Sequence, residues 1–401
     1  MVLMPVEEAR ARILSGVKPL AVENVPLAKA LGRVLAKPLN ARRDQPPFNA
    51  SAMDGYGVRA VDVAIAPATL KVIGTSAAGH AFKGKLKSGE AIRIFTGAPV
   101  PVSADAVVIQ ENTEKDGSSS VTVLQSIRVG QNIRPLGLDF KKGDTLLPRA
   151  IQLNARDIGL AAAMNCDIVS VRRRPVVAVI ATGDELVLPG QKPRADQIVS
   201  SNSNALVAMA EGFGCEVINC GIIPDNLKAT ERAILKMVKA DVLLTTGGAS
   251  VGDHDFIQQA LKNTGVKIDF WKIALRPGKP FMYGRKGKQH VMGLPGNPVS
   301  ALVCARLFLK PLLNAMQGLT VEDAVTTARL GVGMAANDGR QDYVRARLGI
   351  APDGSRTATP FNKQDSSMQR TFRDAHCLII RPPNGPEAPA GELVPILNLD
   401  F

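Results

Sequence analysis

The sequence predicts a chain of several domains built around a central doubly wound α/β domain, with a β-rich insert before it and a β domain after it. Three observations support this fold class. The 401 residues are too many for one hydrophobic core, so several domains are expected. Between residues 176 and 313, strand-like apolar runs alternate regularly with helix-compatible segments, which is typical of a doubly wound domain. On both sides of this region, short β-like runs are separated by frequent glycine and proline residues.

The N-terminal region is predicted to be helical over two segments, with a stop at Pro38. The predicted helices are Val6–Leu14 and Leu27–Leu35. From residue 42 onward short strands and turns take over, which predicts a β-rich insert. Its expected strands are Leu70–Ile73, Ala91–Phe95, Ala106–Gln110 and Val121–Ile127.

A helix-compatible pattern begins again at Asn154. This residue can cap a helix through Met164, because Asp157 follows three residues later. The β-rich insert is therefore predicted to be looped out of a discontinuous helical domain. The predicted domains are 1–41 with 138–171 (helical N-terminal domain), 42–137 (β-rich insert), 172–320 (α/β domain) and 321–401 (C-terminal β domain).

In the central domain, the alternating pattern predicts strands and helices in turn. The strands are Val176–Ala181, Cys215–Ile223, Asp241–Thr246, Lys267–Ala274 and Gln289–Gly293, and the helices are Asn204–Glu211, Leu227–Lys239, Asp255–Asn263 and Val299–Leu313. After Gln317 the pattern changes back to β. Strands are expected there near Tyr343–Leu348, Cys377–Arg381 and Glu392–Ile396.

The composition restricts the classes of function. Lys and Arg number 49 against 36 Asp and Glu, and the resulting net charge of +13 favours anionic partners. Nucleic acid is disfavoured, because aromatic residues make up only 4% of the chain and no nucleic-acid signature is present. Five scattered cysteines without CxxC spacing argue against disulfides and a thiolate zinc site. No signal-peptide core is found, and no apolar run reaches the roughly 18–20 residues of a membrane span, so a cytoplasmic protein is expected.

The most informative stretch is Gly-Leu-Pro-Gly-Asn-Pro-Val-Ser at residues 293–300. A strand ends here, and a sharp turn leads into a helix, so free backbone N–H groups are directed toward one point that suits an anion. The alternative is an ordinary tight connection. Because ligands bind at the carboxyl ends of the strands in a doubly wound sheet, the other strand ends are expected in the same site. The predicted residues are Thr182, Gly247, Gly248, Ser250, Pro295, Gly296, Asn297 and Pro298, with Lys272, Arg276 and Lys279 as cations for phosphate.

The same strand ends are rich in carboxylates, namely Asp184, Glu185, Asp225, Asp253 and Asp255. Carboxylates repel phosphate unless a hard cation lies between them, so the mixture predicts Mg²⁺ bridging to an anionic ligand. Helix capping is the alternative for single residues such as Asp225 or Asp253.

A second group of polar residues lies in the β-rich insert and just after it. Asp54 belongs to an Asp-Gly turn signal, and Thr96 follows a strand-like run. Asp139 lies in the segment that returns to the helical domain. Taken alone, each of these residues is more often structural than functional.

Seven motifs of this sequence occur in the same order, with comparable gaps, in the molybdopterin molybdenumtransferase (MoeA) family, which is similar to the E-domain of gephyrin. They are SAMDGYGV, IFTGAPVP, TGDEL, SNSNAL, TTGGASVGDHD, RPGKPF and LPGNPVSA. The chain therefore resembles this family over nearly its whole length. The resemblance implies an enzyme that inserts molybdenum from molybdate into adenylylated molybdopterin, releases AMP and uses Mg²⁺. It also implies a homodimer with an active site shared between subunits, and transient contact with molybdopterin adenylyltransferase and molybdoenzymes.

Matching of the motifs assigns roles to the residues named above. The resemblance implies catalytic roles for Asp54, Thr96, Glu185, Asp225 and Asp255, and metal binding by Asp184, Glu185 and Asp225. It implies substrate binding by Asp139, Lys272, Arg276, Pro295, Pro298 and either Asp253 or Asp255. Substrate binding is also expected, from their positions at the strand ends, for Thr182, Gly247, Gly248, Ser250, Lys279, Gly296 and Asn297. Which carboxylate holds Mg²⁺ and which acts on water stays open.

The sequence departs from the family's pattern at two places. The small-residue stretch of the C-terminal domain reads Gln-Asp-Ser-Ser-Met-Gln-Arg-Thr at residues 364–371, so phosphate contact by Ser366 or Ser367 is not expected. Arg276 stands where many relatives have lysine. Its planar guanidinium donates several hydrogen bonds in fixed directions, whereas the ammonium group of lysine acts as a point charge.

Two alternatives to this function remain open. One is a molybdopterin adenylyltransferase, which shares the α/β core but lacks the extra β domains and usually carries a TGGTG-type loop. The other is a non-catalytic scaffold or an inactive paralogue of the gephyrin type. Retention of the acidic residues weighs against the second alternative.

Overall fold

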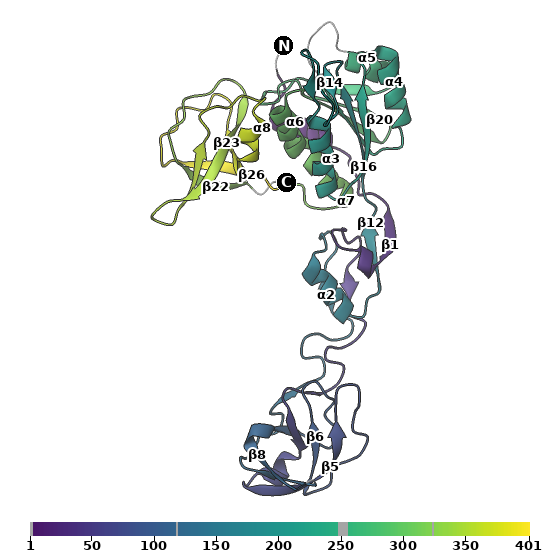
Figure 1. Ribbon diagram of the computed structural model, residues 1–401, viewed down its shortest axis with the longest axis vertical. Helices are drawn as coiled ribbons and strands as arrows, with labels where there is room; N and C mark the ends of the chain where they lie inside the picture. The colour runs from purple at the N-terminus through teal and green to yellow at the C-terminus, as the bar shows by residue number, and fades with distance from the viewer. Residues whose placement is uncertain (1–2, 118, 248–255, 323–324) are drawn as a thin grey trace. The chain divides into compact units, whose positions relative to one another are not determined.

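The computed structural model of the chain describes residues 3–117, 119–247, 256–322 and 325–401. These residues form two compact units, whose ribbons are drawn in Figure 1. The first unit comprises Met1–Glu23, Gly32–Ala36 and Val171–Phe401, and the second comprises Asn24–Leu31 and Lys37–Ser170. The finer division into four domains stays a prediction.

The first unit contains a six-stranded sheet. Its strands are β13 (Val176–Thr182), β16 (Glu216–Ile223), β17 (Val242–Thr246), β18 (Lys267–Trp271), β20 (Met282–Lys286) and β21 (Gln289–Leu294). They lie in the order β16-β13-β17-β21-β20-β18, with β16, β13, β17 and β21 mutually parallel. The predicted doubly wound core is thus confirmed, and β20, which the sequence analysis lacks, extends it by antiparallel pairing with β21 and β18.

The strand predicted for Lys267–Ala274 is shorter than expected. It ends at Trp271, because Lys272 has a φ of 71°, which takes the backbone out of the extended region. The chain then forms β19 (Leu275–Arg276), which pairs with a strand of the C-terminal region. A separate two-stranded sheet is formed by β14 (Leu186–Val187) and β15 (Ile198–Val199).

Helices cover both faces of the six-stranded sheet, with α3 on one side and α4 and α5 on the other (Figure 1). They are α1 (Val6–Leu14), α3 (Asn202–Gly212), α4 (Leu227–Lys236) and α5 (Phe256–Asn263). Successive side chains of β13 point to opposite faces. Val177 and Val179 pack with α1 and α3, whereas Ala178 and Ile180 pack with α4 and α5. Burial on both faces explains why this strand is apolar throughout.

The first predicted N-terminal helix is confirmed, and Val6, Ala9 and Ile13 place it in the α/β core rather than in a separate helical domain. The second predicted helix, Leu27–Leu35, is wrong. Only Leu27–Lys29 forms a short 3₁₀ turn, after β1 (Val22–Pro26), and Gly32 with a φ of 73° is incompatible with a continuing helix.

The predicted helix Val299–Leu313 belongs to a longer helical run, Pro298–Gln317. It consists of α6 (Pro298–Cys304), a π-helical segment (Ala305–Leu309) and α7 (Lys310–Gln317). Among the described residues it is the one helix long and apolar enough to cross a membrane, with a mean hydropathy of 1.4, which the sequence analysis did not expect. Since 78% of this apolar window is buried inside the protein, the core accounts for its composition.

The C-terminal region of the first unit forms a small barrel. Its strands are β22 (Val325–Leu330), β23 (Gln341–Ile350), β24 (Arg356–Pro360), β25 (Cys377–Arg381) and β26 (Leu393–Asn398), and α8 (Gln369–Arg373) precedes β25. The pairings run β23-β24-β22-β26-β25 and return to β23, so the ring of strands closes without a free edge. β23, β25 and β26 correspond to the predicted strands, whereas β22 and β24 are missing from the prediction.

The second unit contains a six-stranded sheet in the order β7-β4-β6-β5-β9-β8. Its strands are β4 (Gly55–Val58), β5 (Ala68–Ser76), β6 (Glu90–Ile94), β7 (Ala106–Ile109), β8 (Thr113–Asp116) and β9 (Ser120–Val123). The four predicted strands correspond to β5, β6, β7 and β9, although β9 ends at Val123 and not at Ile127. Short strand pairs and the helix α2 complete the unit: β2 (Leu39–Asn40) with β11 (Thr145–Leu147), β3 (Ala50–Ser51) with β10 (Ile133–Arg134), then α2 (Ala155–Ala163) and β12 (Ile168–Arg172).

The predicted cap of α2 is confirmed. The side chain of Asn154 accepts hydrogen bonds from the backbone N–H groups of Arg156 and Asp157, and the carboxylate of Asp157 accepts one from the backbone N–H of Asn154. This reciprocal arrangement satisfies the first N–H groups of the helix and fixes where it begins.

Asp400 ties the last residues of the barrel region to the long helix. Its carboxylate accepts hydrogen bonds from Nε of Arg306, at 3.1 Å, and from Nζ of Lys310. The Arg306 side chain is only 4% exposed. Burial raises the pKa of Asp400, but the hydrogen bond from Lys310 and the charges of Arg306 and Lys310 outweigh it, so the pKa lies below its ordinary value.

We expect Asp400→Asn to lower the free energy of unfolding by about 1–2 kcal/mol, because a buried guanidinium loses this counter-ion while Asp400 itself is half exposed. A carboxyl group whose pKa is lowered by folding stabilises the protein at pH values above its ordinary pKa. This stabilisation is lost as the pH falls through the lowered pKa, so the difference in unfolding free energy between the wild type and the variant shrinks in acid. Urea unfolding at about pH 7 and about pH 3 measures both effects. Asp196→Asn, at an exposed residue, serves as the control, and an equal difference at both pH values would contradict the expectation.

Candidate active site

A hollow of about 290 Å³ opens at the carboxyl ends of β13, β17 and β21, where this class of sheet binds ligands. The register aligns the strand ends, with Ala181 opposite Thr246 and Thr246 opposite Leu294. We name this space the polar hollow, because hydroxyl, amide and carboxylate groups line it. The lining residues are Ala181, Thr182, Glu185, Leu186, Ile198, Val199, Ser200, Ser201, Asn202, Thr246, Gly247, Gly296, Asn297, Pro298, Ser367 and Gln369.

Thr182 carries the clearest sign of a ligand. Its side chain is buried, and within the described part of the chain its Oγ1 has no hydrogen-bond partner. A buried hydroxyl without a partner is costly, so a polar group is expected to reach it. Gly247 lies directly against it, with a φ of 89°, and a Cβ there would stand 2.3 Å from the carbonyl oxygen of Thr182. Glycine is therefore required for the backbone to approach this closely.

Asn202 organises the hollow and is missing from the predicted site residues. Its Nδ2 donates to Oγ1 of Thr246 at 3.0 Å and to the carbonyl oxygen of Gly296 at 2.7 Å. One side chain at the start of α3 thereby holds the end of β17 and the turn after β21 together. The signal in the sequence is the position of Asn202 within the SNSNAL motif, immediately before a helix.

The predicted carboxylates are divided between two places. Glu185 lines the polar hollow, whereas Asp184 lies beside Asp225, whose backbone N–H donates to Oδ1 of Asp184 at 3.1 Å. The second contact follows from the parallel pairing of β13 with β16, which sets Thr182 opposite Ile223. Within the described ranges, no three His, Cys, Asp or Glu residues are grouped so that they could hold a metal ion. The three predicted metal ligands therefore do not form a metal site made of protein groups alone.

The predicted cations Lys272, Arg276 and Lys279 do not line the polar hollow. Arg276 donates from Nε and Nη2 to the two carboxylate oxygens of Asp342 and also lies near Asp338, and the bond to Asp342 raises its pKa. The guanidinium of Arg276 is thus paired with carboxylates of the barrel, and its role in holding phosphate stays a prediction. Nζ of Lys272 lies 4.1 Å from the centre of the Trp271 ring, and Lys279 is exposed.

The segment 364–371 reaches the site, although the expectation that Ser366 and Ser367 make no phosphate contact stays a prediction. Ser367 and Gln369 line the polar hollow. Ser366 accepts a hydrogen bond at its Oγ from Nδ2 of Asn297, at 2.8 Å, and at its carbonyl oxygen from the backbone N–H of Val299. This second bond occupies one of the N–H groups at the start of α6 that the sequence analysis treats as free for an anion.

The remaining predicted residues fall into three groups. Gly296, Asn297 and Pro298 line the polar hollow, as predicted, whereas Pro295 is buried beneath the turn. Gly248, Ser250, Asp253 and Asp255 lie outside the described residues, so their roles stay predictions. Asp54, Thr96 and Asp139 belong to the second unit.

Within the second unit, Asp54 and Thr96 form a close pair. Oδ1 of Asp54 accepts hydrogen bonds of 2.7 Å from both the backbone N–H and the hydroxyl of Thr96. The backbone bond, followed by the hydroxyl bond, lowers the pKa of Asp54 below its ordinary value. Asp54 precedes β4 and Thr96 follows β6, and the pairing of Gly55 with Ile94 brings them to one edge of the sheet. Asp139 is exposed and is not part of this pair.

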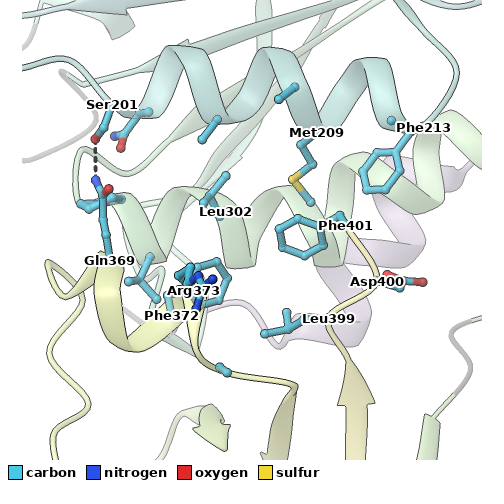
Figure 2. A pocket seen from close by; sticks show the side chains of 17 residues that line it. Ser201, Met209, Phe213, Leu302, Gln369, Phe372, Arg373, Leu399, Asp400 and Phe401 are labelled. Atoms are coloured by element: carbon cyan, nitrogen blue, oxygen red, sulfur yellow. Dashed lines mark hydrogen bonds between the residues drawn. The ribbon is translucent and has the colours of Figure 1, made fainter. Parts of the chain in front are cut away.

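A second, larger space adjoins the polar hollow. It measures about 660 Å³ and lies between α3, α6, α8 and residues 399–401. Figure 2 shows the side chains of Met209, Phe213 and Phe401 at one end of it and the hydrogen bond from Gln369 to Ser201 at the other. We name this space the apolar chamber.

The fold and the site define a class of protein: an α/β ligand-binding domain with its site at the strand ends, extended by a β-rich unit and a barrel. Family models match the chain at residues 4–165 as "MoeA N-terminal region (domain I and II)", at 178–315 as "Probable molybdopterin binding domain" and at 327–399 as "MoeA C-terminal region (domain IV)". The chain belongs to the molybdopterin molybdenumtransferase (MoeA) family of enzymes, as its motifs predict.

Individual relatives agree with this assignment. The molybdopterin molybdenumtransferase of Haemophilus influenzae is 35% identical over 402 residues, which cover 98% of both chains. That of Bacillus subtilis is 33% identical and covers 98% of this chain and 94% of its own. Among solved structures, the molybdopterin biosynthesis MoeA protein of Pyrococcus horikoshii is similar with a TM-score of 0.82 at 29% identity, over 99% of this chain and 100% of that one. The predicted family and fold class are confirmed.

We expect Gly247→Ala to lower the free energy of unfolding by about 1–3 kcal/mol, because an L side chain is strained at this φ and its Cβ would collide with the Thr182 carbonyl. Denaturant unfolding of the purified chain measures the change. Gly212→Ala is the matched control, since that glycine ends α3 and nothing lies within 4 Å of its added Cβ. Equal stabilities of the two variants would contradict the close approach.

We expect Thr96→Val to raise the pKa of Asp54 part of the way toward its ordinary value, because the hydroxyl bond is lost while the backbone bond remains. Asp54 then stays ionised over a narrower range of acidic pH. Carboxyl chemical shifts followed through an NMR titration measure the pKa. Thr113→Val, whose hydroxyl donates to the Gln110 carbonyl, provides a control on the same sheet, and an unchanged titration of Asp54 would argue against the pair.

Proposed function

We propose that this chain inserts molybdenum from molybdate into adenylylated molybdopterin and releases AMP with the help of Mg²⁺. Molybdenum insertion in the biosynthesis of the molybdenum cofactor is the activity of the family to which the chain belongs. The observation that carries the finer proposal is the polar hollow. The carboxylate of Glu185 lines it together with the buried hydroxyl of Thr182, for which the described residues offer no hydrogen-bond partner. Neither a molybdopterin adenylyltransferase nor a non-catalytic scaffold is favoured, since relatives that match from end to end are named transferases.

The charge of the hollow supports a role for Mg²⁺. Among its described lining residues Glu185 is the charged group, and the other polar groups are neutral hydroxyls and amides. An anionic substrate would therefore meet a carboxylate without a compensating cation. Mg²⁺ is commonly held by one or two carboxylates together with substrate phosphates, so Glu185 would hold this ion together with phosphate oxygens of the substrate. When bound, it would neutralise charge on the phosphate oxygens.

The chain's own groups bind and orient the substrate. The hydroxyls of Thr182 and Ser201 donate hydrogen bonds to substrate oxygens, and Asn202 keeps the surrounding strand ends fixed. In the anhydride cleavage, water adds to a phosphorus atom, the P–O bond to the leaving group breaks, and AMP departs. The carboxylate of Glu185 accepts the proton of the attacking water.

We also propose that the chain works as a cytoplasmic homodimer in which the Asp54–Thr96 pair of one subunit completes the polar hollow of its partner. The pair is exposed and already ordered by two hydrogen bonds, as a group that meets a ligand would be. Transient contact with molybdopterin adenylyltransferase would supply the substrate, and contact with molybdoenzymes would deliver the product.

The test is AMP release from adenylylated molybdopterin by the purified protein, with and without molybdate and Mg²⁺. We expect release to depend on both, and Glu185→Gln to slow it about 100-fold or more, because the variant can neither accept the proton nor hold a cation. Glu211→Gln, at an exposed residue of α3 outside the hollow, should leave the rate unchanged. Tight substrate binding without turnover under every metal condition would contradict the enzymatic proposal.

A further inference from the structure

The apolar chamber borders the polar hollow. Ser201, Asn202, Pro298 and Gln369 line both spaces, so a ligand that occupies both would pass the hydrogen bond from Gln369 to Ser201. All the residues of both spaces belong to the first unit. The two spaces differ in chemistry: hydroxyls, amides and a carboxylate in one, and mainly apolar side chains in the other.

The walls of the apolar chamber suit a flat, weakly polar group. Met209, Phe213, Leu302, Phe372 and Phe401 contribute broad apolar or aromatic surfaces. Aromatic rings and a thioether interact favourably with the faces of planar ring systems. Its volume of about 660 Å³ lies within the usual range of small-molecule sites.

The side of the chamber formed by the barrel region is held in place. Asp400 binds Arg306 and Lys310 on the long helix, and this fixes the backbone on either side of it, including Phe401. At the opposite end Nε2 of Gln369 donates to Oγ of Ser201, which joins α8 to the start of α3 (Figure 2). The chamber therefore has walls anchored at both ends, as a preorganised binding site has.

We infer that the apolar chamber binds a fused nitrogen heterocycle of the substrate, while the polar hollow holds the phosphate to which that ring system is attached. This inference rests on the proposed function, because adenylylated molybdopterin carries two such heterocycles, the pterin and the adenine. Both are flat and both are connected to the phosphate anhydride. The apolar surfaces contact the ring face, and the amides of Asn202 and Gln369 are available at the junction for its polar edge.

Binding of the two heterocycles without the phosphate tests the inference directly. The probes are 6-hydroxymethylpterin and adenosine, titrated into the full chain by calorimetry in the presence and absence of inorganic phosphate. Ala205→Trp fills the chamber from α3, and we expect it to weaken binding of the ring about tenfold or more. Glu211→Trp adds the same side chain to the same helix outside the chamber, and should change the affinity less than about twofold.

Phe401→Ala gives a second variant that does not crowd the core, because its side chain is 47% exposed. It should weaken the same probe in the same direction. Pterin binding that both variants weaken assigns the chamber to the pterin, and the same result with adenosine assigns it to the adenine. If neither probe binds, or if neither variant affects the binding, the inference is overturned.

The two proposals fail in different ways. If molybdate-dependent AMP release is normal but neither heterocycle uses the chamber, this inference alone is overturned. If the heterocycle binds as expected but no AMP is released under any metal condition, the chamber stands as a ring-binding site and the enzymatic proposal is overturned.

Discussion

The parallel register of β13, β17 and β21 is the constraint on which the candidate site depends. Ala181 lies opposite Thr246, and Thr246 opposite Leu294, so the three chain segments leave the sheet at one level. Because side chains alternate along a strand, a slip by one residue would turn Thr182 away from its present side. The close approach of Gly247 to the Thr182 carbonyl is possible only in this register. The strand register that packs the sheet therefore also determines the geometry of the site.

The barrel region adds a second layer of organisation. Ser366 binds both the side chain of Asn297 and the backbone of Val299, and Gln369 binds Ser201. These bonds join the turn after β21 and the start of α3 to one short segment. Thus the α/β domain supplies most of the lining of the polar hollow and of the apolar chamber, and the barrel region supplies the rest.

Much of the fold could be predicted from the sequence because its signals are local. The apolar runs of β13, β17 and β21 and the cap at Asn154 depend on residue order alone. The prediction of a helix at Leu27–Leu35 is wrong for a local reason. Gly32 adopts a positive φ, and the spacing of apolar residues does not reveal this conformation. β22 and β24 were beyond prediction, because many of their side chains are exposed and their pairing partners lie far away in the chain.

The candidate site could be predicted in part. Thr182 and the turn at Gly296–Pro298 follow from the rule that ligands bind at strand ends. The contact of Arg276 with the barrel could not be predicted, because its partner Asp342 stands 66 residues away and nothing in the sequence pairs them. That Ser367 and Gln369 line the polar hollow could not be predicted for the same reason, because residue spacing does not indicate contacts between distant segments.

The pairing of β19 with β23 has a consequence for domain motion. Leu275 and Arg276 lie in the chain between β18 and β20 of the α/β sheet. They are hydrogen-bonded into the barrel sheet opposite Gln341 and Asp342, and the Arg276–Asp342 ion pair reinforces the joint. Such a shared strand resists separation of the barrel from the α/β domain. Because Ser366 and Gln369 bind the α/β domain elsewhere, at the turn after β21 and the start of α3, movement of the barrel as a rigid body would have to break contacts at one of these joints.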